Sequence, residues 1–588
     1  MRRQGIGVSP GLAQGRALVL QPAETPIFRL PIDTTAVAGE ISRLQEARAE
    51  ARRQIMGIRD RIAAAVGEAY ARVFEAHLLI LDDRQLHEEP ARIIREEKVN
   101  AEWALSSVTE RLLAAFERIP DPYLRERSGD LEDVARRLQQ ILAGESRRHD
   151  LSELEEDAVV VAHSLSPSDA ALLHHPHVVA FVTDLGGRTS HTAILANALD
   201  LPAVVGLHDF SALVKEGDLL LVDGAQGEIL VNPTATEESH WKETRRARLE
   251  REAQLQSERD LPATTQDGVE IEILANIEFP REIPRAIAQG ARGIGLYRSE
   301  FLFLAHSPAL PDEDDHRTTY EEIARAAGSR TAIIRTLDLG GDKYFHEVLD
   351  RNEANPVMGL RAIRFCLKRP DIFRTQLRGL LRASIAGTLR VMFPLVSGVG
   401  ELRAARALLD EVRAGLEAEG VPTGPLPVGI MVEVPSAALI ADRLAREVEF
   451  FSIGTNDLLQ YSLALDRGNE SLAGLYQPFH PALLRLIHGI VQAADAAGIE
   501  VSLCGEMASD PLAIPVLVGL GLRRLSANPV AIPEVRATVR RLHAGRAAAL
   551  AEDVLSLATA EEIEERVRAA FPPEPPAETG ARALEETE

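Results

Sequence analysis

Residues 428–457, VGIMVEVPSAALIADRLAREVEFFSIGTND, hold the pattern that decides the fold of the C-terminal part of this chain. A short apolar run, VGIMVEVP, is followed by a helical stretch and then by a second apolar run, FFSIGTND. Short apolar runs bounded by polar or turn residues are typical of buried strands. The stretch therefore predicts a strand–helix–strand unit, with Glu433 at the end of its first strand and Asn456 and Asp457 after its second.

The same rhythm continues from about residue 264 to residue 571. Eight strand candidates occur there: EILANIE, GIGLYRSE, AIIRTLD, LRVMFPLV, VGIMVEVP, FFSIGTND, VSLCGEM and LRRLSAN. Helical stretches separate most of them. Eight strands that alternate with helices over this length favour a (β/α)₈ barrel, with a longer open sheet as the alternative.

The N-terminal part of the chain has a different organisation. GIGVSPGLAQGRALVL is typical of short strands broken by glycine turns, and residues 35–142 have the alanine-, arginine- and glutamate-rich composition and apolar spacing of an antiparallel helical bundle. Strand signals return with AVVVAH, VVAFVTD and the hairpin-like GDLLLVDGAQGEILVN. We therefore predict an α/β domain that begins at the N-terminus, accepts a helical insertion and resumes near residue 150.

Two further segments are charged and have weak apolar periodicity. TEESHWKETRRARLEREAQLQSERDLP predicts a solvated linker helix between domains. The tail from Phe571, FPPEPPAETGARALEETE, is rich in proline and glutamate, a composition that predicts disorder.

The composition excludes several classes of function. The chain has 588 residues and a net charge of −24, so its overall field repels nucleic acids and anionic membrane surfaces. Its two cysteines, Cys366 and Cys504, are too few for a disulfide framework, which favours a reducing compartment. The start, MRRQGIGVSPG, has no apolar leader, and no stretch is long and apolar enough to span a bilayer. We expect a multidomain cytoplasmic protein with no nucleic-acid or membrane partner.

Polar side chains follow five of the predicted barrel strands. They are Arg298, Arg335 with Asp338, Glu433, Asn456 with Asp457, and Cys504. In (β/α)₈ barrels the active site lies where the carboxyl ends of the strands meet. A ring of arginine, carboxylate, amide and thiol groups there indicates a functional site rather than packing.

The residue types constrain the ligand. Arg298 and Arg335, joined by Arg361, Arg364 and Arg467, form a cationic cluster suited to phosphate or carboxylate. Glu433 and Asp457 are oxygen donors that can hold Mg²⁺ beside a phosphate, or can serve as structural partners of the arginines. Arg364 could also be a solvated helix-face residue. Cys504 is either an acid–base or ligand-contacting group or an inert core cysteine, and Cys366 is predicted to be core.

The stretch GGRTSHTAI, residues 186–194, frames His191 at the start of a predicted helix. Gly186 and Gly187 allow a tight turn, and Thr189 or Ser190 can cap the helix. The positive end of the helix dipole would keep the imidazole neutral and would favour a phosphoryl group on it. The alternatives are a helix cap with an incidental histidine, or a metal site, which the spacing disfavours. The two sites together suggest that His191 receives a phosphoryl group from a magnesium-bound compound in the barrel.

These motifs resemble those of Enzyme I of the bacterial sugar phosphotransferase system, the phosphoenolpyruvate–protein phosphotransferases. GGRTSHTAI, RTLDLGGDK, NPVMGLRAIR, GIMVEVPSA, FFSIGTNDLLQY, DRGN and CGEMASD occur in the order of that family. VSPGLAQG and FEAHLLILDD match near the N-terminus. The resemblance covers the chain from about Gly5 to Phe571.

Together with the strand and helix patterns, the resemblance implies six segments. Residues 1–33 and 147–234 would form an α/β phosphohistidine domain, and residues 34–146 an inserted helical domain that binds the phosphocarrier protein HPr. Residues 235–263 would be the linker helix. Residues 264–571 would form a phosphoenolpyruvate-binding (β/α)₈ barrel that also makes a homodimer, followed by a disordered tail, residues 572–588.

The resemblance also implies the reaction. Phosphoenolpyruvate with Mg²⁺ would phosphorylate His191 and leave pyruvate, and the phosphoryl group would pass to a histidine of HPr. The implied roles are substrate binding by Arg298, Arg335, Arg361, Asn456 and Arg467, Mg²⁺ ligation by Glu433 and Asp457, protonation of enolpyruvate by Cys504, and contact with HPr by His77, Asp82 and Asp83.

Two other functions remain as alternatives. A pyruvate phosphate dikinase or phosphoenolpyruvate synthase shares a phosphohistidine domain and this kind of barrel. It also needs a nucleotide-binding domain, and the first 150 residues contain no glycine-rich phosphate loop. A catalytically silent phosphoenolpyruvate sensor would have lost the histidine or a metal-binding position, whereas this chain has all of them.

Overall fold

The computed structural model describes residues 1–20, 27–66, 73–117, 128–144, 156–165, 175–186, 201–306, 309–339, 355–467 and 469–572, with Leu154, Leu173 and Ala196. The chain divides into two compact units, Met1–Arg246 and Ala247–Glu588. Each unit is described by itself. Among the described residues, no helix is both long and apolar enough to cross a membrane.

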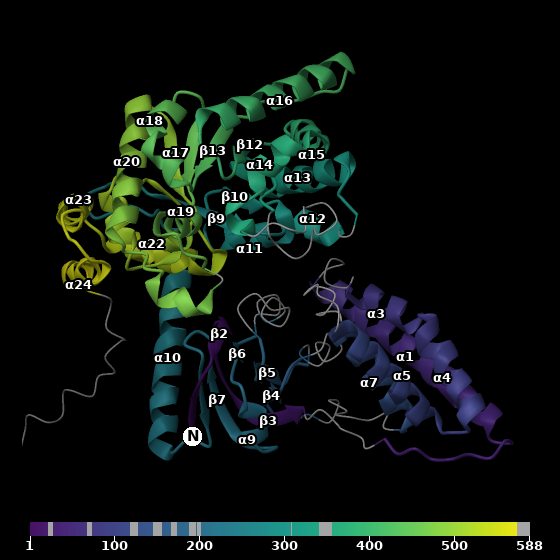
Figure 1. The fold of residues 1–588 in the computed structure, drawn as a ribbon. Coiled ribbons are helices and arrows are strands. Elements are labelled where there is room, and N and C mark those ends of the chain that lie inside the picture. Colours follow the sequence, from purple (N-terminus) through teal and green to yellow (C-terminus); the bar gives the residue numbers. More distant parts are fainter. Residues whose placement is uncertain are drawn as a thin grey trace, which may run out of the picture. The chain divides into compact units, whose positions relative to one another are not determined.

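The first unit contains a sheet whose eight described strands follow the order β1-β8-β7-β3-β4-β5-β6-β2 (Figure 1). The strands are β1 (Arg2–Gln4), β2 (Ile6–Ser9), β3 (Leu12–Leu20), β4 (Ala158–Ala162), β5 (Val178–Thr183), β6 (Ala203–Val205), β7 (Leu219–Asp223) and β8 (Glu228–Val231). β3 to β6 are parallel, and β7 and β8 form the antiparallel hairpin expected from GDLLLVDGAQGEILVN.

β3 and β4, the strands that flank the helical insertion in the sequence, are paired neighbours in the sheet. Arg16 of β3 is opposite Ala158 of β4, and Leu20 is opposite Ala162. Because β3 precedes the insertion and β4 follows it, the two chain segments belong to one sheet, which confirms the predicted interrupted α/β domain. The described short helix α9 (Phe210–Leu213) follows β6.

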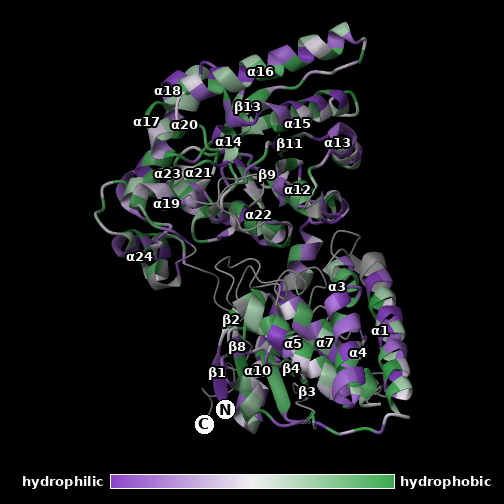
Figure 2. Ribbon diagram, turned by 45° about the vertical axis from the view of Figure 1, so that its right-hand side comes forward, coloured by the Kyte–Doolittle hydropathy of each residue, from purple (hydrophilic) through white to green (hydrophobic). Residues whose placement is uncertain are grey.

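The insertion is a helical bundle, as its apolar spacing predicted. Its described helices are α1 (Val37–Val66), α3 (Val73–Leu81), α4 (Arg84–Glu97), α5 (Ala101–Glu117) and α7 (Ser128–Leu142). One apolar core joins them, including Ile55 of α1, Phe74 of α3 and Leu105 of α5. Hydrophobic and hydrophilic residues alternate along α1 and α4 in Figure 2, as expected for helices with one buried face.

The expectation that His77 contacts a carrier protein is wrong. The His77 side chain is 0% exposed, with its Nε2 3.3 Å from Asp130 Oδ1 of α7. A surface-docked protein cannot reach a side chain inside the bundle core. Asp82, by contrast, is partly exposed and forms ion pairs with Arg48 and Arg52.

The expected linker helix is α10 (Ala235–Ser257). Trp241 on its N-terminal half packs on Leu221 and Leu230 of the sheet. The expected tail, residues 572–588, lies outside the described residues after its first position.

The second unit is built on a closed barrel of eight parallel strands, in the order β9 to β16, with β16 paired to β9. The strands are β9 (Glu272–Ile277), β10 (Ile294–Arg298), β11 (Ala332–Arg335), β12 (Leu389–Phe393), β13 (Val428–Val432), β14 (Phe450–Ile453), β15 (Glu500–Leu503) and β16 (Arg524–Ala527). All eight expected strands are present, and barrel closure excludes the open-sheet alternative.

Helices surround the barrel strands (Figure 1). Those described are α11 (Ile283–Ala288), α12 (Glu300–His306), α13 (Glu313–Ala327), α14 (Ala362–Lys368), α15 (Pro370–Ala383), α16 (Val399–Ala418), α17 (Pro435–Leu439), α18 (Ala441–Leu444), α19 (Thr455–Leu463), α20 (Pro481–Ala497), α21 (Ile514–Gly519), α22 (Ile532–Arg541), α23 (Ala544–Val554) and α24 (Ala560–Ala570). The 3₁₀ turn η7 (Glu506–Ser509) follows β15.

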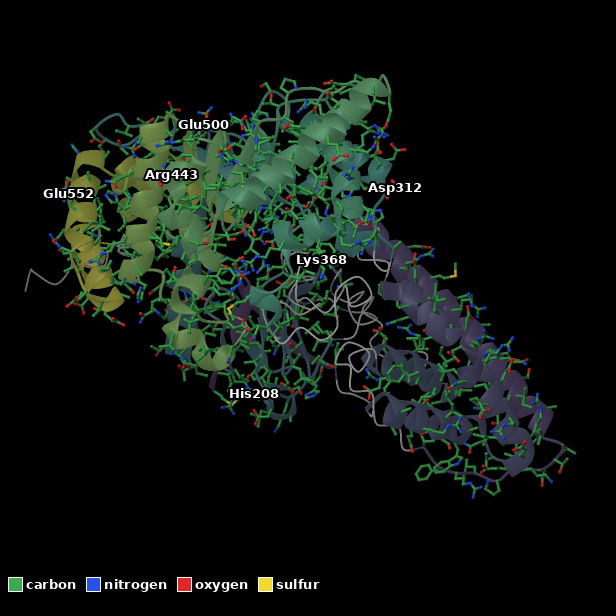
Figure 3. The ribbon with its side chains drawn as sticks, turned by 45° about the horizontal axis from the view of Figure 1, so that its top comes forward. His208, Asp312, Lys368, Arg443, Glu500 and Glu552 are labelled. Carbon is green, nitrogen blue, oxygen red and sulfur yellow. The ribbon has the colours of Figure 1, made fainter. Side chains whose placement is uncertain are left out.

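The two ends of the barrel differ in chemistry. At the amino ends of the strands, Glu500, labelled in Figure 3, forms ion pairs with Arg390 of β12 and Arg524 of β16. Arg524 Nε also lies 2.8 Å from Glu272 Oε2 of β9. These charged side chains pair with one another across the end of the barrel, which indicates that this end contributes to stability. The side chains that the sequence predicts to be functional lie at the other end.

Candidate active site at the carboxyl ends of the barrel strands

Four buried or largely buried charged side chains form a chain of ion pairs after β10 and β11. Arg335, the last residue of β11, pairs with Glu300 at the start of α12 and lies 2.9 Å from Asp338 Oδ2. Asp338 Oδ1 in turn accepts a 2.8 Å hydrogen bond from Arg361. Glu300 was not identified from the sequence, although it stands only two residues after Arg298 in GIGLYRSE.

The pKa shifts of Asp338 and of the two arginines favour their charged forms, whereas burial raises the pKa of Glu300. Burial opposes ionisation of Asp338, but the positive charges of Arg335 and Arg361 outweigh it and lower the pKa of Asp338 to about 2. Burial alone would lower the pKa of Arg335, yet the carboxylates of Glu300 and Asp338 raise it. The strand ends thus hold fixed positive charge in a place from which water is largely excluded.

Three carboxylates converge at the centre of this end of the barrel. One oxygen each of Asp338, Glu433 and Asp457 lies within 4.8 Å of the others, and all three residues are buried. Glu433 follows β13, and its Oε1 accepts a 2.6 Å hydrogen bond from Leu395 N–H. Burial, and then the negative charges of Asp457 and Asp338, raise the pKa of Glu433 well above its ordinary value. A cation placed among these carboxylates would relieve that repulsion.

The donor set fits a hard divalent cation. Asp457 Oδ1 is buried and has no hydrogen-bond partner, and carboxylate oxygens are the ligands that such cations prefer. The sequence predicted Glu433 and Asp457 as metal ligands and placed Asp338 only among the strand-end groups. The structure therefore shows a buried acidic triad that could bind a metal ion, with Asp338 as its third member.

The arginines have unused donors at the same place. Arg335 Nε and Arg361 Nε are buried without a hydrogen-bond partner. A buried, unsatisfied donor is unfavourable unless a ligand completes it, so these atoms mark a position for an anion. Arg361 also lies 3.4 Å from Asp457 Oδ2 and donates to Tyr461 Oη at 3.2 Å, which ties it to the acidic triad.

The other predicted substrate-binding residues lie around this centre. Arg298 is the last residue of β10 and donates to Glu278 Oε1 at 2.9 Å. Arg467 is about half exposed, with its guanidinium 3.8 Å from Asp457 Oδ1. Asn456 uses its amide to bridge to Glu506, accepting from the Glu506 N–H at 3.0 Å and donating to Oε1 at 3.1 Å. The amide is therefore held in one orientation.

Cys504 follows β15 and faces the interior of the barrel. It shares an apolar layer with Leu296, Ile333, Met392, Met431 and Phe450. Ser452 Oγ lies 3.2 Å from the Cys504 sulfur. Burial raises the pKa of the Cys504 thiol to about 11, so it keeps its proton at neutral pH. A thiol that stays protonated can act as a proton donor.

Two other residues of the sequence analysis have structural roles. Arg364 donates to the carbonyl oxygens of Met358 and Gly359, at 3.0 and 3.3 Å, and so holds its own turn. Cys366 is buried in the core, as predicted.

His191 lies outside the described residues, and the chain before it is described as far as Gly186. Gly186 has a φ of 124°, in the region that favours glycine; Gly187, the other residue of the expected turn, lies outside the described residues. Asp184, directly after β5, accepts a 2.9 Å hydrogen bond from Ser211 N–H. His163 Nδ1, directly after β4, lies 3.0 Å from Asp184 Oδ2. Asp184, seven residues before His191 in the sequence, is therefore held by both neighbouring segments.

Three family models match this chain. Residues 4–127 match the N-terminal domain of phosphoenolpyruvate-utilising enzymes, residues 154–227 their mobile domain, and residues 252–544 their phosphoenolpyruvate-binding domain. The last match contains every one of the barrel residues described above.

Full-length relatives are similar over nearly the whole chain. The phosphoenolpyruvate-protein phosphotransferase of Geobacillus stearothermophilus is 43% identical over 570 residues, covering 96% of this chain and 98% of that protein. The protein of the same name from Haemophilus influenzae is 41% identical over 564 residues, with 96% and 98% coverage. That from Staphylococcus aureus is 40% identical over 566 residues, again with 96% and 98% coverage. The chain belongs to the family of phosphoenolpyruvate–protein phosphotransferases, Enzyme I of the sugar phosphotransferase system.

Proposed function

We propose that this enzyme phosphorylates its own His191 from phosphoenolpyruvate, with Mg²⁺, and passes the phosphoryl group to a histidine of HPr. One observation carries the proposal: buried arginines with unused donors lie beside a buried acidic triad at the carboxyl ends of the barrel strands. That combination suits a small dianionic phosphate compound bound together with a divalent cation.

The arginines orient the substrate. Arg298, Arg335, Arg361 and Arg467 bind the phosphate and carboxylate groups of phosphoenolpyruvate. Arg361 also keeps Asp338 and Asp457 in place. Asn456 contacts the phosphate, and its bridge to Glu506 fixes the direction in which it can do so. Planar guanidinium groups held by buried carboxylates lose little freedom when the substrate binds.

Glu433 and Asp457 would hold the Mg²⁺ ion. When bound, the cation supplies positive charge that stabilises the phosphate and enolate oxygens. Asp338 lies close enough to join them, but its charge is already balanced by Arg335 and Arg361. We therefore assign Asp338 to orienting the arginines and keep Glu433 and Asp457 as the ligands.

The transfer step breaks the bond between the bridging oxygen and phosphorus of phosphoenolpyruvate and forms a bond between phosphorus and an imidazole nitrogen of His191. The enolate of pyruvate is left in the barrel. Cys504 then donates its thiol proton to the methylene carbon, which gives pyruvate, and the raised pKa of the thiol keeps that proton available at neutral pH.

The remaining assignments follow the same family pattern. The helical insertion, residues 34–146, would dock HPr, the barrel would form the homodimer, and the protein would act in the cytoplasm. Asp82 and Asp83 remain the proposed contacts with HPr, without His77. The dikinase alternative needs a nucleotide-binding domain, whereas residues 4–127 match the N-terminal domain of phosphoenolpyruvate-utilising enzymes.

The test is incubation of the full chain with phosphoenolpyruvate labelled in its phosphate, with and without Mg²⁺ and without any nucleotide. We expect an acid-labile protein label, equimolar pyruvate and loss of both on Mg²⁺ removal. His191→Ala should remove the label. A label that requires ATP would favour the dikinase alternative, and phosphoenolpyruvate binding without any label would favour the silent sensor.

A further inference from the structure

Gln376, on the outer helix α15, connects two chain segments of the candidate site. One segment holds Arg298 and Glu300, and the other holds Arg335 and Asp338. Its side chain is 1% exposed and makes three hydrogen bonds. Gln376 Oε1 accepts from the backbone N–H of Leu337 at 3.0 Å, and Nε2 donates to Ser299 Oγ at 3.0 Å and to Tyr320 Oη at 3.0 Å. Lys368, labelled in Figure 3, ends α14 just before this helix.

Two of the three partners of Gln376 lie next to charged residues of the candidate site in the sequence. Ser299 stands between Arg298 and Glu300, and Leu337 stands between Arg335 and Asp338. The strand ladder ends at Thr336, whose N–H donates to Met392 O at 3.0 Å. Leu337 N–H is therefore the first backbone donor after β11 that does not bond to the neighbouring strand. Its hydrogen-bond acceptor is the side chain of Gln376, which lies outside the barrel. Cys366 Sγ lies 3.9 Å from the Leu337 carbonyl oxygen.

The hydrogen-bond pattern permits one orientation of the Gln376 amide. Leu337 N–H needs an acceptor, so Oε1 must face it, and Nε2 must then face the two hydroxyl groups, which can accept. Tyr320 Oη is also 2.9 Å from His316 Nδ1, so the bridge is anchored to α13. Ser299, His316 and Tyr320 are all 0% exposed, so bulk solvent does not reach them and a lost hydrogen bond is unfavourable.

We infer that Gln376 is a positioning residue for phosphoryl transfer, an inference that rests on the proposed function. It fixes the spacing between the segment with Arg298 and Glu300 and the segment with Arg335 and Asp338. Arg335 pairs with Glu300 across that spacing, so a shift of either segment would change the direction of its guanidinium. Gln376 does not touch the substrate and acts through Ser299 and the Leu337 peptide group.

The test compares kinetic constants of Gln376→Met with those of wild type in the full chain. Methionine has similar length and volume but makes none of the three hydrogen bonds. An anion can still be bound by slightly displaced arginines, whereas in-line transfer cannot tolerate the displacement. We therefore expect kcat for labelling from phosphoenolpyruvate to fall about 10–100-fold. KM should change by less than about threefold.

Leu380→Ala is the matched control, because Leu380 lies one turn further along α15, is 0% exposed and is apolar. It should lower the melting temperature of the barrel at least as much as Gln376→Met while keeping kcat near wild type. Gln376→Glu should recover part of kcat, since one carboxylate oxygen can accept from Leu337 N–H and the hydroxyl groups can donate to the other.

Several results would overturn the inference. Wild-type kcat in Gln376→Met would do so, and so would equal losses of kcat in Gln376→Met and Leu380→Ala at equal melting temperatures. A Gln376→Glu variant no more active than Gln376→Met would also contradict it. If wild type itself takes no label from phosphoenolpyruvate, the proposed function fails and this inference fails with it. A labelled wild type with an unaffected Gln376→Met refutes the inference alone.

Discussion

At the residue scale, burial suits the thiol of Cys504 to the proton-donor role that we propose for it. Burial raises its pKa to about 11, even though the nearby Ser452 hydroxyl favours the thiolate. A raised pKa in a thiol extends the protonated form to higher pH, so the proton donor is present throughout the neutral range. The same burial makes this cysteine a poor nucleophile.

Removal of this proton donor should slow pyruvate formation. We expect Cys504→Ala to reduce the rate of deuterium incorporation from solvent into the methyl group of pyruvate by about 100-fold, the usual contribution of a general acid. In wild type this rate should show no titration from Cys504 until the pH approaches about 11. Cys366→Ala is the control, and equal effects of both substitutions would refute the assignment.

Gly505 is a second residue whose identity the site requires. A Cβ at Gly505 would lie 1.7 Å from Thr455 Oγ1, so the segment after β15 touches the start of α19 directly. Thr455 precedes Asn456 and Asp457, and an added methyl group must displace them. We expect Gly505→Ala to reduce labelling from phosphoenolpyruvate at least about tenfold through this displacement.

Gly489→Ala is the matched control for that change, since a Cβ at Gly489 would meet no atom within 4 Å. It should leave labelling near wild type. A fully active Gly505→Ala variant would show that the contact between the two segments does not position Asn456 and Asp457.

At the element scale, the sequence predicted the barrel strands. It predicted only in part which side chains at their ends lie close together. The barrel strands are short apolar runs, and five of them are followed by polar groups, as VGIMVEVP is at Glu433. The eight strands and the expected position of the site therefore followed from pattern and topology. The role of Asp338 beside Glu433 and Asp457 did not follow. Spacing along the chain does not tell which of the side chains at the strand ends face one another, because this depends on the register of the barrel strands.

The burial of His77 was missed for a different reason. FEAHLLILDD was interpreted as a surface that faces a partner, yet Phe74, His77 and Leu81 lie on one face of α3 by helical spacing. That periodicity was the available signal, because Phe74 and Leu81 belong to the bundle core. The Gln376 bridge had no signal of this kind, since a single glutamine in an amphipathic helix has no pattern that predicts its partners.

The helix α13 carries a buried histidine that should make barrel stability depend on pH. Burial lowers the pKa of His316 to about 3, below its ordinary value of 6.5. The unfolded chain therefore binds the proton more readily, and the stability that is present above pH 6.5 decreases as the pH falls toward about 3. Between pH 7.5 and pH 5 the loss should be about 2 kcal/mol.

Calorimetry of the barrel transition over this pH range provides the measurement. In His316→Gln the group that titrates is absent, so the difference in stability between wild type and variant should shrink as the pH falls. Parallel curves for the two proteins would show that His316 does not carry this dependence.

At the scale of the whole molecule, the proposed function divides the chemistry between the two units. The second unit brings buried arginines and carboxylates together at one end of its barrel. The whole chain has a net charge of −24, so binding of an anion there depends on these local groups and not on the overall charge of the protein. The first unit carries the His191 segment after β5. Substitutions in the barrel should therefore block entry of the phosphoryl group from phosphoenolpyruvate without blocking its exchange between His191 and HPr.

The most direct test of this division is to measure labelling of His191 from both directions in the same set of variants. Asp457→Ala should take no label from phosphoenolpyruvate with Mg²⁺, yet should be labelled at close to the wild-type rate by phosphorylated HPr. His191→Ala should take label from neither donor. If Asp457→Ala, still folded by its melting temperature, loses both directions equally, the two-site account is contradicted.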